Sequence, residues 1–276
     1  MTDRYAVIGN PIAHSKSPEI QAAFARQTGQ DMSYERLQAP LAGFAATAMR
    51  FAREGGRGAN VTVPFKLEAF ALAQARSARA ERAGASTTLA WRGTHWFGDN
   101  TDGVGLVRDL TVNVGAALAG RDLLVLGAGG AARGILGPLL AAGPRSLVIG
   151  NRTAARAEEL ARLFAAEGPI AARTFGDLGG RRFDLVIDAT SANLTTAGDG
   201  DAAALLPWPE TIFAPGALAY DLKYAALPTA FLQWARRHGA DRAVDGLGML
   251  IEQAAESFLL WRGVRPDTAP AFALFR

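Results

Sequence analysis

Residues 122–140, DLLVLGAGGAARGILGPLL, constrain the fold of this chain more than any other segment. An apolar run of strand length leads into a glycine-rich turn, and an apolar helical pattern follows. The turn reads Gly127-x-Gly129-x-x-Ala132: Gly127 allows a tight turn, Gly129 lets the backbone approach a pyrophosphate, and Ala132 permits close helix packing. The start of the helix offers N–H groups and a partial positive charge to phosphates. The pattern predicts a dinucleotide-binding domain, with cofactor contacts from Gly127, Ala128, Gly129, Gly130 and Ala131.

The next strand indicates which dinucleotide is bound. An NAD-binding domain usually places Asp or Glu about 20 residues after the glycines, where it holds the ribose 2′-hydroxyl. Here the strand SLVIG leads into Asn151, Arg152 and Thr153, and Arg156 follows one turn later. Arginines suit a 2′-phosphate, which a carboxylate would repel. We therefore expect NADP; the alternative is that both arginines are solvated helix residues and Thr153 is only an N-cap.

Strand and helix patterns alternate along the whole chain, which predicts an α/β fold with mostly parallel sheets covered by helices. The N-terminal series comprises residues 4–10, 17–29, 32–39, 41–56, 58–63 and 66–75, followed by two strand-like pieces at 86–93 and 94–100. A second series starts near Asp102, which we take as the boundary between domains 1–101 and 102–236. An amphipathic helix is expected at 249–263, and its pattern does not say which domain it packs against.

Composition excludes several function classes. The 276 residues favour two domains, and the net charge of +3 comes from scattered arginines without the basic, aromatic-lined stripe of a nucleic-acid binder. There is no cysteine, and the three histidines are far apart, so no metal site is expected. The N-terminus does not resemble a signal peptide, and no apolar run approaches the ~20 residues of a membrane span. We therefore expect a soluble cytoplasmic protein without membrane or nucleic-acid partners.

The segment GANVTVPFK, residues 58–66, places a lysine where helices usually carry acids. It reads as a strand that breaks at Pro64 into a helix, so Lys66 falls in the first helical turn. This end of a helix is positive and disfavours a cation by roughly 0.3–1 kcal/mol. Taken alone, Lys66 is compatible with an ordinary surface lysine as well as with a functional amine.

Several short motifs occur in a specific order, and together they resemble those of the shikimate dehydrogenase family over nearly the whole chain. They are SKSP at 15–18, NVTVP at 60–64 with Lys66, GDNTDG at 98–103, GAGGAARG at 127–134, NRTAAR at 151–156, and DGLGML at 245–250 leading to Gln253. The resemblance implies reversible reduction of 3-dehydroshikimate to shikimate by NADPH, a step toward chorismate and the aromatic amino acids. It also implies an N-terminal substrate domain, a Rossmann NADP domain, a C-terminal segment of about 237–276 that returns to the first domain, and an active site in the cleft between the domains.

The resemblance assigns roles residue by residue. Lys66 would handle the proton of the hydroxyl being oxidised, with Asp102 as its partner; Asp102 can alternatively be only a helix N-cap. Removing hydride from a secondary alcohol does require a group that accepts the hydroxyl proton. Ser15 and Ser17 would bind the substrate carboxylate, although Ser17-Pro18 also fits a plain helix start. The other implied substrate contacts are Thr62, Thr87, Tyr224 and Gln253, and the other cofactor contacts are Thr190, Leu222 and Gly246.

Two motifs depart from the family pattern. Where the family commonly has GAVNTL, this chain has GASTTL, so Thr87 replaces an asparagine that holds substrate hydroxyls. The family's NATSxG becomes DATSAN, which brings Asp188 and Asn193 near the cofactor. These changes leave substrate specificity open between shikimate, quinate and another polyol acid. A non-catalytic NADP-binding sensor is a further alternative, and the sequence also leaves open whether the protein forms a homodimer.

Overall fold

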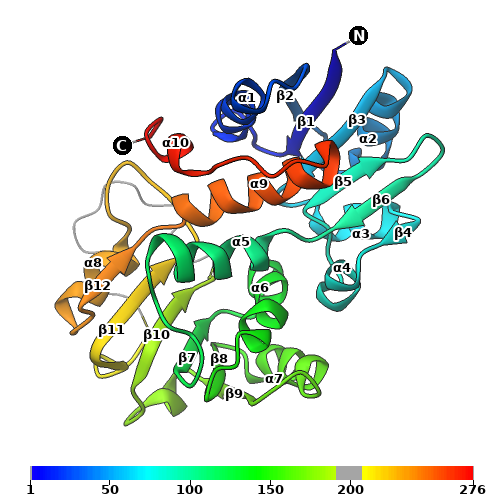
Figure 1. The fold of residues 1–276 in the computed structure, drawn as a ribbon. Coiled ribbons are helices and arrows are strands. Elements are labelled where there is room, and N and C mark those ends of the chain that lie inside the picture. Colours follow the sequence, from blue (N-terminus) through cyan, green and yellow to red (C-terminus); the bar gives the residue numbers. More distant parts are fainter. Residues whose placement is uncertain (1, 191–206, 276) are drawn as a thin grey trace. The chain divides into compact units, whose positions relative to one another are not determined.

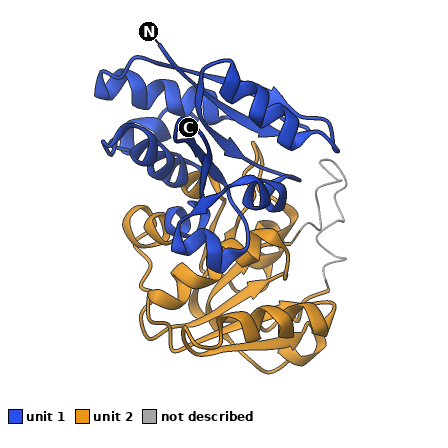
Figure 2. Cartoon of the chain, turned by 90° about the vertical axis from the view of Figure 1, so that its right-hand side faces the viewer, with its two compact units in different colours: residues 1–106, 250–276 blue, residues 107–249 orange. Residues whose placement is uncertain are grey.

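The structure is a computed structural model that describes residues 2–190 and 207–275. The chain divides into two compact units, residues 1–106 with 250–276 and residues 107–249 (Figure 2). It enters the second unit within helix α5 (Asp102–Arg108) and leaves it within α9 (Leu247–Arg262). Residues 237–249, which we expected in the first domain, belong to the second unit. The reason is that β12 (Arg242–Val244) pairs with β11 (Phe213–Asp221) and extends that unit's sheet.

The first unit is built on a six-stranded sheet with the order β2-β1-β3-β5-β6-β4 (Figure 1). Its strands are β1 (Asp3–Gly9), β2 (Met32–Gln38), β3 (Gly56–Val61), β4 (Ala75–Arg76), β5 (Thr88–Trp91) and β6 (Trp96–Asp99). Strands β1, β2 and β3 pair in parallel, and β5 runs antiparallel to both β3 and β6. The two strand-like pieces expected between residues 86 and 100 therefore form a hairpin that widens the parallel sheet.

Helices cover this sheet because their apolar residues recur at helical spacing. The described helices of the first unit are α1 (Ser17–Thr28), α2 (Phe44–Arg53), α3 (Lys66–Leu72), α4 (Ala78–Ala83), most of α5, most of α9, and α10 (Ala269–Phe272). In α2, Phe44, Ala48 and Phe51 lie on one face and are buried against β1 and β3 residues of the core. The ring of Phe44 stacks on Phe65, just before α3, with centroids 5.2 Å apart. This contact holds the start of α3, and with it Lys66, against the core.

The second unit has a fully parallel sheet with the order β12-β11-β10-β7-β8-β9. Its other strands are β7 (Asp122–Leu126), β8 (Ser146–Asn151), β9 (Ile170–Thr174) and β10 (Phe183–Asp188). Strand β7 comes first in the chain and lies in the middle, so the order reverses between β7 and β10, as in a doubly wound Rossmann domain. The predicted α/β fold with mostly parallel sheets is confirmed.

Helices of this unit are α6 (Gly130–Ala141), α7 (Ala154–Phe164) and α8 (Ala230–Arg237), with a π-helical turn at Asp109–Asn113 and a 3-10 turn at Gly176–Leu178. The sequence patterns did not predict α8. Its residues Phe231 and Trp234 join Trp208 and Phe213 in an aromatic core against the sheet. Among the helices that the structure describes, none is long and apolar enough to span a lipid bilayer.

Candidate active site

Lys66 and Asp102 form an ion pair in the first unit. Lys66 opens α3, and its Nζ donates a hydrogen bond of 2.6 Å to Oδ2 of Asp102, the first residue of α5. The Lys66 side chain is 23% exposed and the Asp102 side chain 11%. The pair is thus sheltered on one side while the amine stays accessible to a small molecule. An amine held in this way can exchange a proton with a substrate hydroxyl.

Asn100 takes over the capping of α5, so that the carboxylate of Asp102 can pair with Lys66. Its Oδ1 accepts the backbone N–H of Asp102 at 3.2 Å, and its Nδ2 donates to the carbonyl of Ala85. The open N–H at the start of α5 is therefore satisfied by Asn100, and the side chain of Asp102 turns to Lys66. The motif GDNTDG contains Asn100, but nothing in its spacing identified this contact.

Ser15 and Ser17 lie together in the loop that enters α1. The hydroxyl of Ser15 donates to Oγ of Ser17 at 3.2 Å and accepts the N–H of Ser17 at 3.3 Å. No side chain caps α1, so Ser17 does not act as a plain N-cap. Arg36 of β2, which sequence reasoning missed, donates from Nε to the carbonyl of Ser15 at 2.9 Å and from Nη2 to Glu19 at 2.7 Å. Arg36 therefore fixes the backbone of the serine loop.

Thr87 and Gln253 meet at Thr101, one residue before Asp102. Oγ1 of Thr87 accepts the N–H of Thr101 at 2.9 Å, and Oε1 of Gln253 accepts the hydroxyl of Thr101 at 3.2 Å. Both side chains are buried. Thr62 follows β3 and is half-buried, and a Cβ placed on Gly9 would overlap its methyl group. The structure thus ties two of the expected substrate residues to the backbone next to Asp102.

A buried hydrogen-bond network continues behind these residues. Nδ2 of Asn60 donates to Ser257 at 2.8 Å, and the hydroxyls of Thr88 and Ser257 lie 2.8 Å apart. The hydroxyl of Tyr34 donates to Oδ1 of Asn60 at 2.7 Å, and burial raises the pKa of Tyr34 well above its usual value. Tyr34 therefore remains a neutral donor, and the network joins β2, β3, β5 and α9. The sequence patterns identified Asn60 only as part of NVTVP and did not identify Ser257.

The glycine loop of the second unit has the geometry expected of a phosphate cradle. Gly127 follows β7 with φ +103°, and a Cβ there would meet the backbone of Ala189 at 3.0 Å. Among the described residues, a Cβ on Gly129 or Gly130 would meet no heavy atom within 4 Å. Helix α6 begins at Gly130 without a side-chain cap, and Ala132 is fully buried. Within the described part of the chain, the first N–H groups of α6 therefore have neither a side-chain cap nor a close neighbour at the glycine loop, which fits a pyrophosphate.

The four residues expected at the 2′-phosphate lie at the end of β8 and the start of α7. Nδ2 of Asn151 donates to the carbonyl of Thr153 at 2.9 Å and shapes the turn. Thr153 occupies the N-cap position of α7 but makes no cap hydrogen bond with its side chain. Arg152 and Arg156 are exposed, and neither has an acid partner in the described part of the chain. This leaves two guanidinium groups available for a phosphate.

Thr190, Leu222 and Gly246 follow the carboxyl ends of β10, β11 and β12, respectively. The N–H of Leu222 donates to the carbonyl of Asp188 at 3.1 Å, and the N–H of Gly246 donates to the carbonyl of Lys223 at 2.8 Å. A Cβ on Gly246 would overlap the carbonyl of Leu222. Tyr224 is half-buried in this second unit, whereas the other expected substrate residues belong to the first. Asn193 lies outside the described residues.

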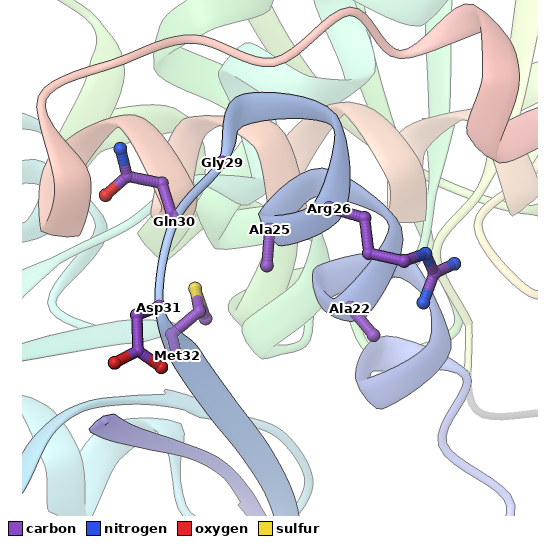
Figure 3. Close-up of a pocket in the computed structure, with 7 residues that line it drawn as sticks. All are labelled: Ala22, Ala25, Arg26, Gly29, Gln30, Asp31 and Met32. Atoms are coloured by element: carbon purple, nitrogen blue, oxygen red, sulfur yellow. The ribbon is translucent and has the colours of Figure 1, made fainter. Parts of the chain in front are cut away.

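A surface hollow of about 470 Å³ lies elsewhere on the first unit, between the end of α1 and the start of β2 (Figure 3). It is lined by Ala22, Ala25, Arg26, Gly29, Gln30, Asp31 and Met32. None of the expected site residues is among them. Across residues 2–190 and 207–275, no group of three or more His, Cys, Asp or Glu side chains is arranged to hold a metal ion.

Three family models match the chain. Residues 7–89 match the shikimate dehydrogenase substrate binding domain, residues 109–209 match shikimate / quinate 5-dehydrogenase, and residues 246–271 match the shikimate 5′-dehydrogenase C-terminal domain. Together these matches cover more than half of the chain, and they fall on both units.

Relatives of similar length are also found. A shikimate dehydrogenase (NADP(+)) of Alkalilimnicola ehrlichii is 58% identical over 100% of this chain and 99% of its own length, and one of Nitrosospira multiformis is 55% identical over 100% and 98%. An Ael1 enzyme from Pseudomonas putida has a similar structure, with a TM-score of 0.91, 45% identity and coverage of 99% and 98% of the two chains. The shikimate 5-dehydrogenase of Thermus thermophilus, solved with NADP(H) and shikimate, has a TM-score of 0.84, 34% identity and coverage of 97% and 96%.

Proposed function

Because this chain belongs to the shikimate dehydrogenase family, we propose that it reversibly reduces 3-dehydroshikimate to shikimate with NADPH. It is an NADP-dependent oxidoreductase acting on a CH–OH group, and the reaction serves the biosynthesis of aromatic amino acids. The observation that carries the proposal is the ion pair between Lys66 and Asp102, at 2.6 Å. A protein that only bound the nucleotide would have no use for an amine–carboxylate pair in its other unit.

Bound NADP supplies a nicotinamide ring that accepts hydride from, or returns it to, the reacting carbon. Lys66 does the matching proton chemistry. In the direction of oxidation, Nζ of Lys66 takes up the proton of the substrate hydroxyl; in reduction it donates that proton to the carbonyl oxygen. Asp102 holds Nζ in place through the 2.6 Å hydrogen bond.

The substrate is bound by residues of the first unit in this proposal. Ser15 and Ser17 hold its carboxylate, on a loop whose backbone Arg36 fixes. Its ring hydroxyls contact Thr62, Thr87 and Gln253, and Tyr224 is a further proposed substrate residue. Support comes from the match of residues 7–89 to a substrate binding domain and from the shared attachment of Thr87 and Gln253 to Thr101.

NADP is bound by the second unit. The open glycine loop and the uncapped start of α6 receive the pyrophosphate. The 2′-phosphate is held by Arg152 and Arg156 together with Asn151 and Thr153. Thr190, Leu222 and Gly246 contact the nicotinamide half. The absence of an acid at the end of β8 supports NADP over NAD, because a carboxylate there would repel the 2′-phosphate.

The proposal includes a cytoplasmic location, because the reaction draws on NADPH and a small metabolite. It does not require a second copy of the chain, since Lys66 and Asp102 come from one chain. A homodimer is therefore a separate hypothesis, which sedimentation equilibrium tests directly.

The experiment follows NADPH formation at 340 nm with shikimate and with quinate, each supplied with NADP or NAD. We expect shikimate with NADP to give by far the highest kcat/KM. The replacement of asparagine by Thr87 makes quinate the informative control. Faster turnover of quinate would assign the enzyme to a related polyol acid, and NADP binding without turnover of either acid would identify a sensor.

A further inference from the structure

Two acids lie side by side at the carboxyl edge of the second unit's sheet. Asp188 ends β10, Asp221 ends β11, and the parallel register places them opposite each other. Both are fully buried. The mechanism above uses neither. Because this edge adjoins the reversal of strand order between β7 and β10, it is where doubly wound sheets bind their ligands.

Asp188 is held by three polar contacts. Its Oδ1 accepts the N–H of Thr190 at 2.9 Å and the hydroxyl of Thr190 at 2.7 Å, and its Oδ2 accepts Nζ of Lys223 at 3.2 Å. Asp221 accepts the N–H of Lys223 at 3.0 Å and the hydroxyl of Thr229 at 2.6 Å. Lys223 thus connects the two strand ends, through its side chain to one acid and through its backbone to the other.

These contacts shape the backbone that we assign to the nicotinamide half of the cofactor site. The tight turn at Gly127 packs against Ala189 and against the N–H of Thr190, which Asp188 holds. The carbonyl of Asp188 accepts the N–H of Leu222. The carbonyl of Lys223 accepts the N–H of Gly246. The side chain of Asp188 therefore holds Thr190 directly, whereas Leu222 and Gly246 are held by the backbone carbonyls of Asp188 and Lys223.

The cluster holds two buried acids and one lysine, which pairs with Asp188. Burial raises the pKa of Asp188, while the charge of Lys223 opposes that rise. Burial, together with the charge of Asp188, raises the pKa of Asp221 to about 6. An ammonium beside Asp188 therefore favours its ionised form, which accepts hydrogen bonds from Thr190 and Lys223 at once. Removing one member of a buried pair leaves an uncompensated charge, whereas replacing both by neutral groups is often tolerated.

We propose that Asp188 and Lys223 are positioning residues for the nicotinamide half of NADP(H). The side chain of Asp188 holds Thr190, and the ion pair between Asp188 and Lys223 joins the two strand ends whose backbone carries Leu222 and Gly246, so that the pair sets the affinity for this half of the cofactor. The inference rests on the proposed function, because it assumes that NADP binds at this edge. It concerns a feature of this chain, since the acid stands where the family motif has asparagine.

The test measures binding of NADP and of 2′,5′-ADP, which carries the 2′-phosphate but no nicotinamide. The variants are Asp188→Asn, Lys223→Met and the double variant. We expect each single change to weaken NADP binding about tenfold, within the range measured for coupled groups. Binding of 2′,5′-ADP should stay within about twofold, and the double variant should recover most of the lost NADP affinity because neither Asp188 nor Lys223 is then left without its partner.

Thermal unfolding of the same variants separates an effect on the placement of the cofactor-binding residues from an effect on the stability of the fold. Wild-type affinity for NADP in both single variants would overturn the inference even if Tm falls. A loss of equal size for NADP and 2′,5′-ADP would also overturn it, because the effect would then be general. If one single variant does not fold, a double variant that binds NADP no better than the remaining single variant decides against the inference. Failure of the wild type to bind either ligand would instead overturn the proposed function, and this inference with it.

Discussion

At the scale of single residues, the candidate site depends on charged side chains that are not used for helix capping or for a structural ion pair. Asn100 satisfies the N–H of Asp102, which leaves the carboxylate for Lys66. Arg152 has no acid beside it in the described part of the chain, so its guanidinium can meet a phosphate. At Asp102 the neighbouring Asn100 leaves the carboxylate to pair with Lys66, and at Arg152 the lack of a nearby acid among the described residues leaves the guanidinium to bind a phosphate. Substitution of the charged residue itself tests that role most directly.

Lys66→Ala should lower kcat for shikimate oxidation far more than it weakens shikimate binding. The lysine acts mainly in the transition state, and loss of a general acid–base group typically costs ~10²–10⁴-fold in rate. Steady-state kinetics and shikimate binding by calorimetry give the two quantities. Asp102→Asn, which keeps the shape of the partner, serves as the matched variant. A normal kcat with a raised KM in Lys66→Ala would show that Lys66 only binds substrate.

Arg152→Ala should weaken NADP binding and leave NAD binding nearly unchanged. The exposed guanidinium of Arg152 has the fork geometry that matches a phosphate, and NAD offers no phosphate at this place. Dissociation constants for both cofactors, measured by fluorescence titration, check the expectation. The exposed Arg181 is a control surface arginine. Equal losses for NADP and NAD would remove the 2′-phosphate assignment.

At the scale of elements, single side-chain hydrogen bonds connect residues at the ends of strands with residues at the starts of helices. Thr87, just before β5, accepts the N–H of Thr101 just before α5. Asp221, at the end of β11, accepts the hydroxyl of Thr229, which also caps α8 by accepting the N–H of Leu232. Each link is buried or half-buried, so its loss affects the stability of the unit as well as the placement of nearby site residues.

Thr87→Val should destabilise the protein by about 1–3 kcal/mol, the usual cost of a buried polar group without a partner. Valine keeps the shape of threonine but cannot accept the N–H of Thr101, and both positions are buried. Urea unfolding of Thr87→Val and of Thr87→Ser, which retains the hydroxyl, measures the difference. Equal stability of Thr87→Val and the wild type would mean that the N–H of Thr101 finds another acceptor.

Asp221→Asn should stabilise the protein at pH 8 and lose this advantage as the pH falls toward 4. The pKa of Asp221 is about 6 in the folded state, so the folded protein binds its proton more tightly than the unfolded chain. Ionisation therefore costs wild-type stability as pH rises from about 4 to 6, by up to roughly 3 kcal/mol. Asparagine avoids this cost. The free energy of unfolding of both proteins at pH 4.5, 6 and 8 tests the sign; a pH-independent difference would contradict it.

At the scale of the whole molecule, the two units differ in how the chain builds them. The second is one continuous stretch, residues 107–249, whereas the first needs both ends of the chain. In the first unit, Ser257 and Gln253 of α9 complete the polar network that includes Asn60 and Thr101. Residues 1–106 by themselves would lack α9, and the network would lose Gln253 and Ser257.

A fragment of residues 107–249 should therefore fold and bind 2′,5′-ADP, whereas a fragment of residues 1–106 should not fold. The first fragment keeps all six strands of its sheet and the aromatic core around Trp208 and Trp234. Circular dichroism with thermal melting checks folding, and calorimetry checks binding. A cooperative melt of residues 1–106 alone would show that α9 is dispensable for the first unit.

Much of this protein follows from its sequence because local patterns determine it. The order of most strands and helices, the glycine turn at Gly127 and the position of Lys66 at the start of α3 each depend on a few neighbouring residues. The missed elements were mostly short: β4, α4, β12 and α10, together with α8. They contain too few residues for a periodic pattern to stand out.

Which of these residues meet depends on the tertiary structure, although the family resemblance had already predicted the pairing of Lys66 with Asp102. Lys66 and Asp102 are 36 positions apart, Asn60 and Ser257 are 197 apart, and Asp188 and Lys223 are 35 apart. Such pairs arise when strand ends and helix starts come together in the fold, and no periodicity along the chain records them. For the same reason the sequence identified Asp188 only as a departure from the family's NATSxG motif, whereas the structure shows that it pairs with Lys223.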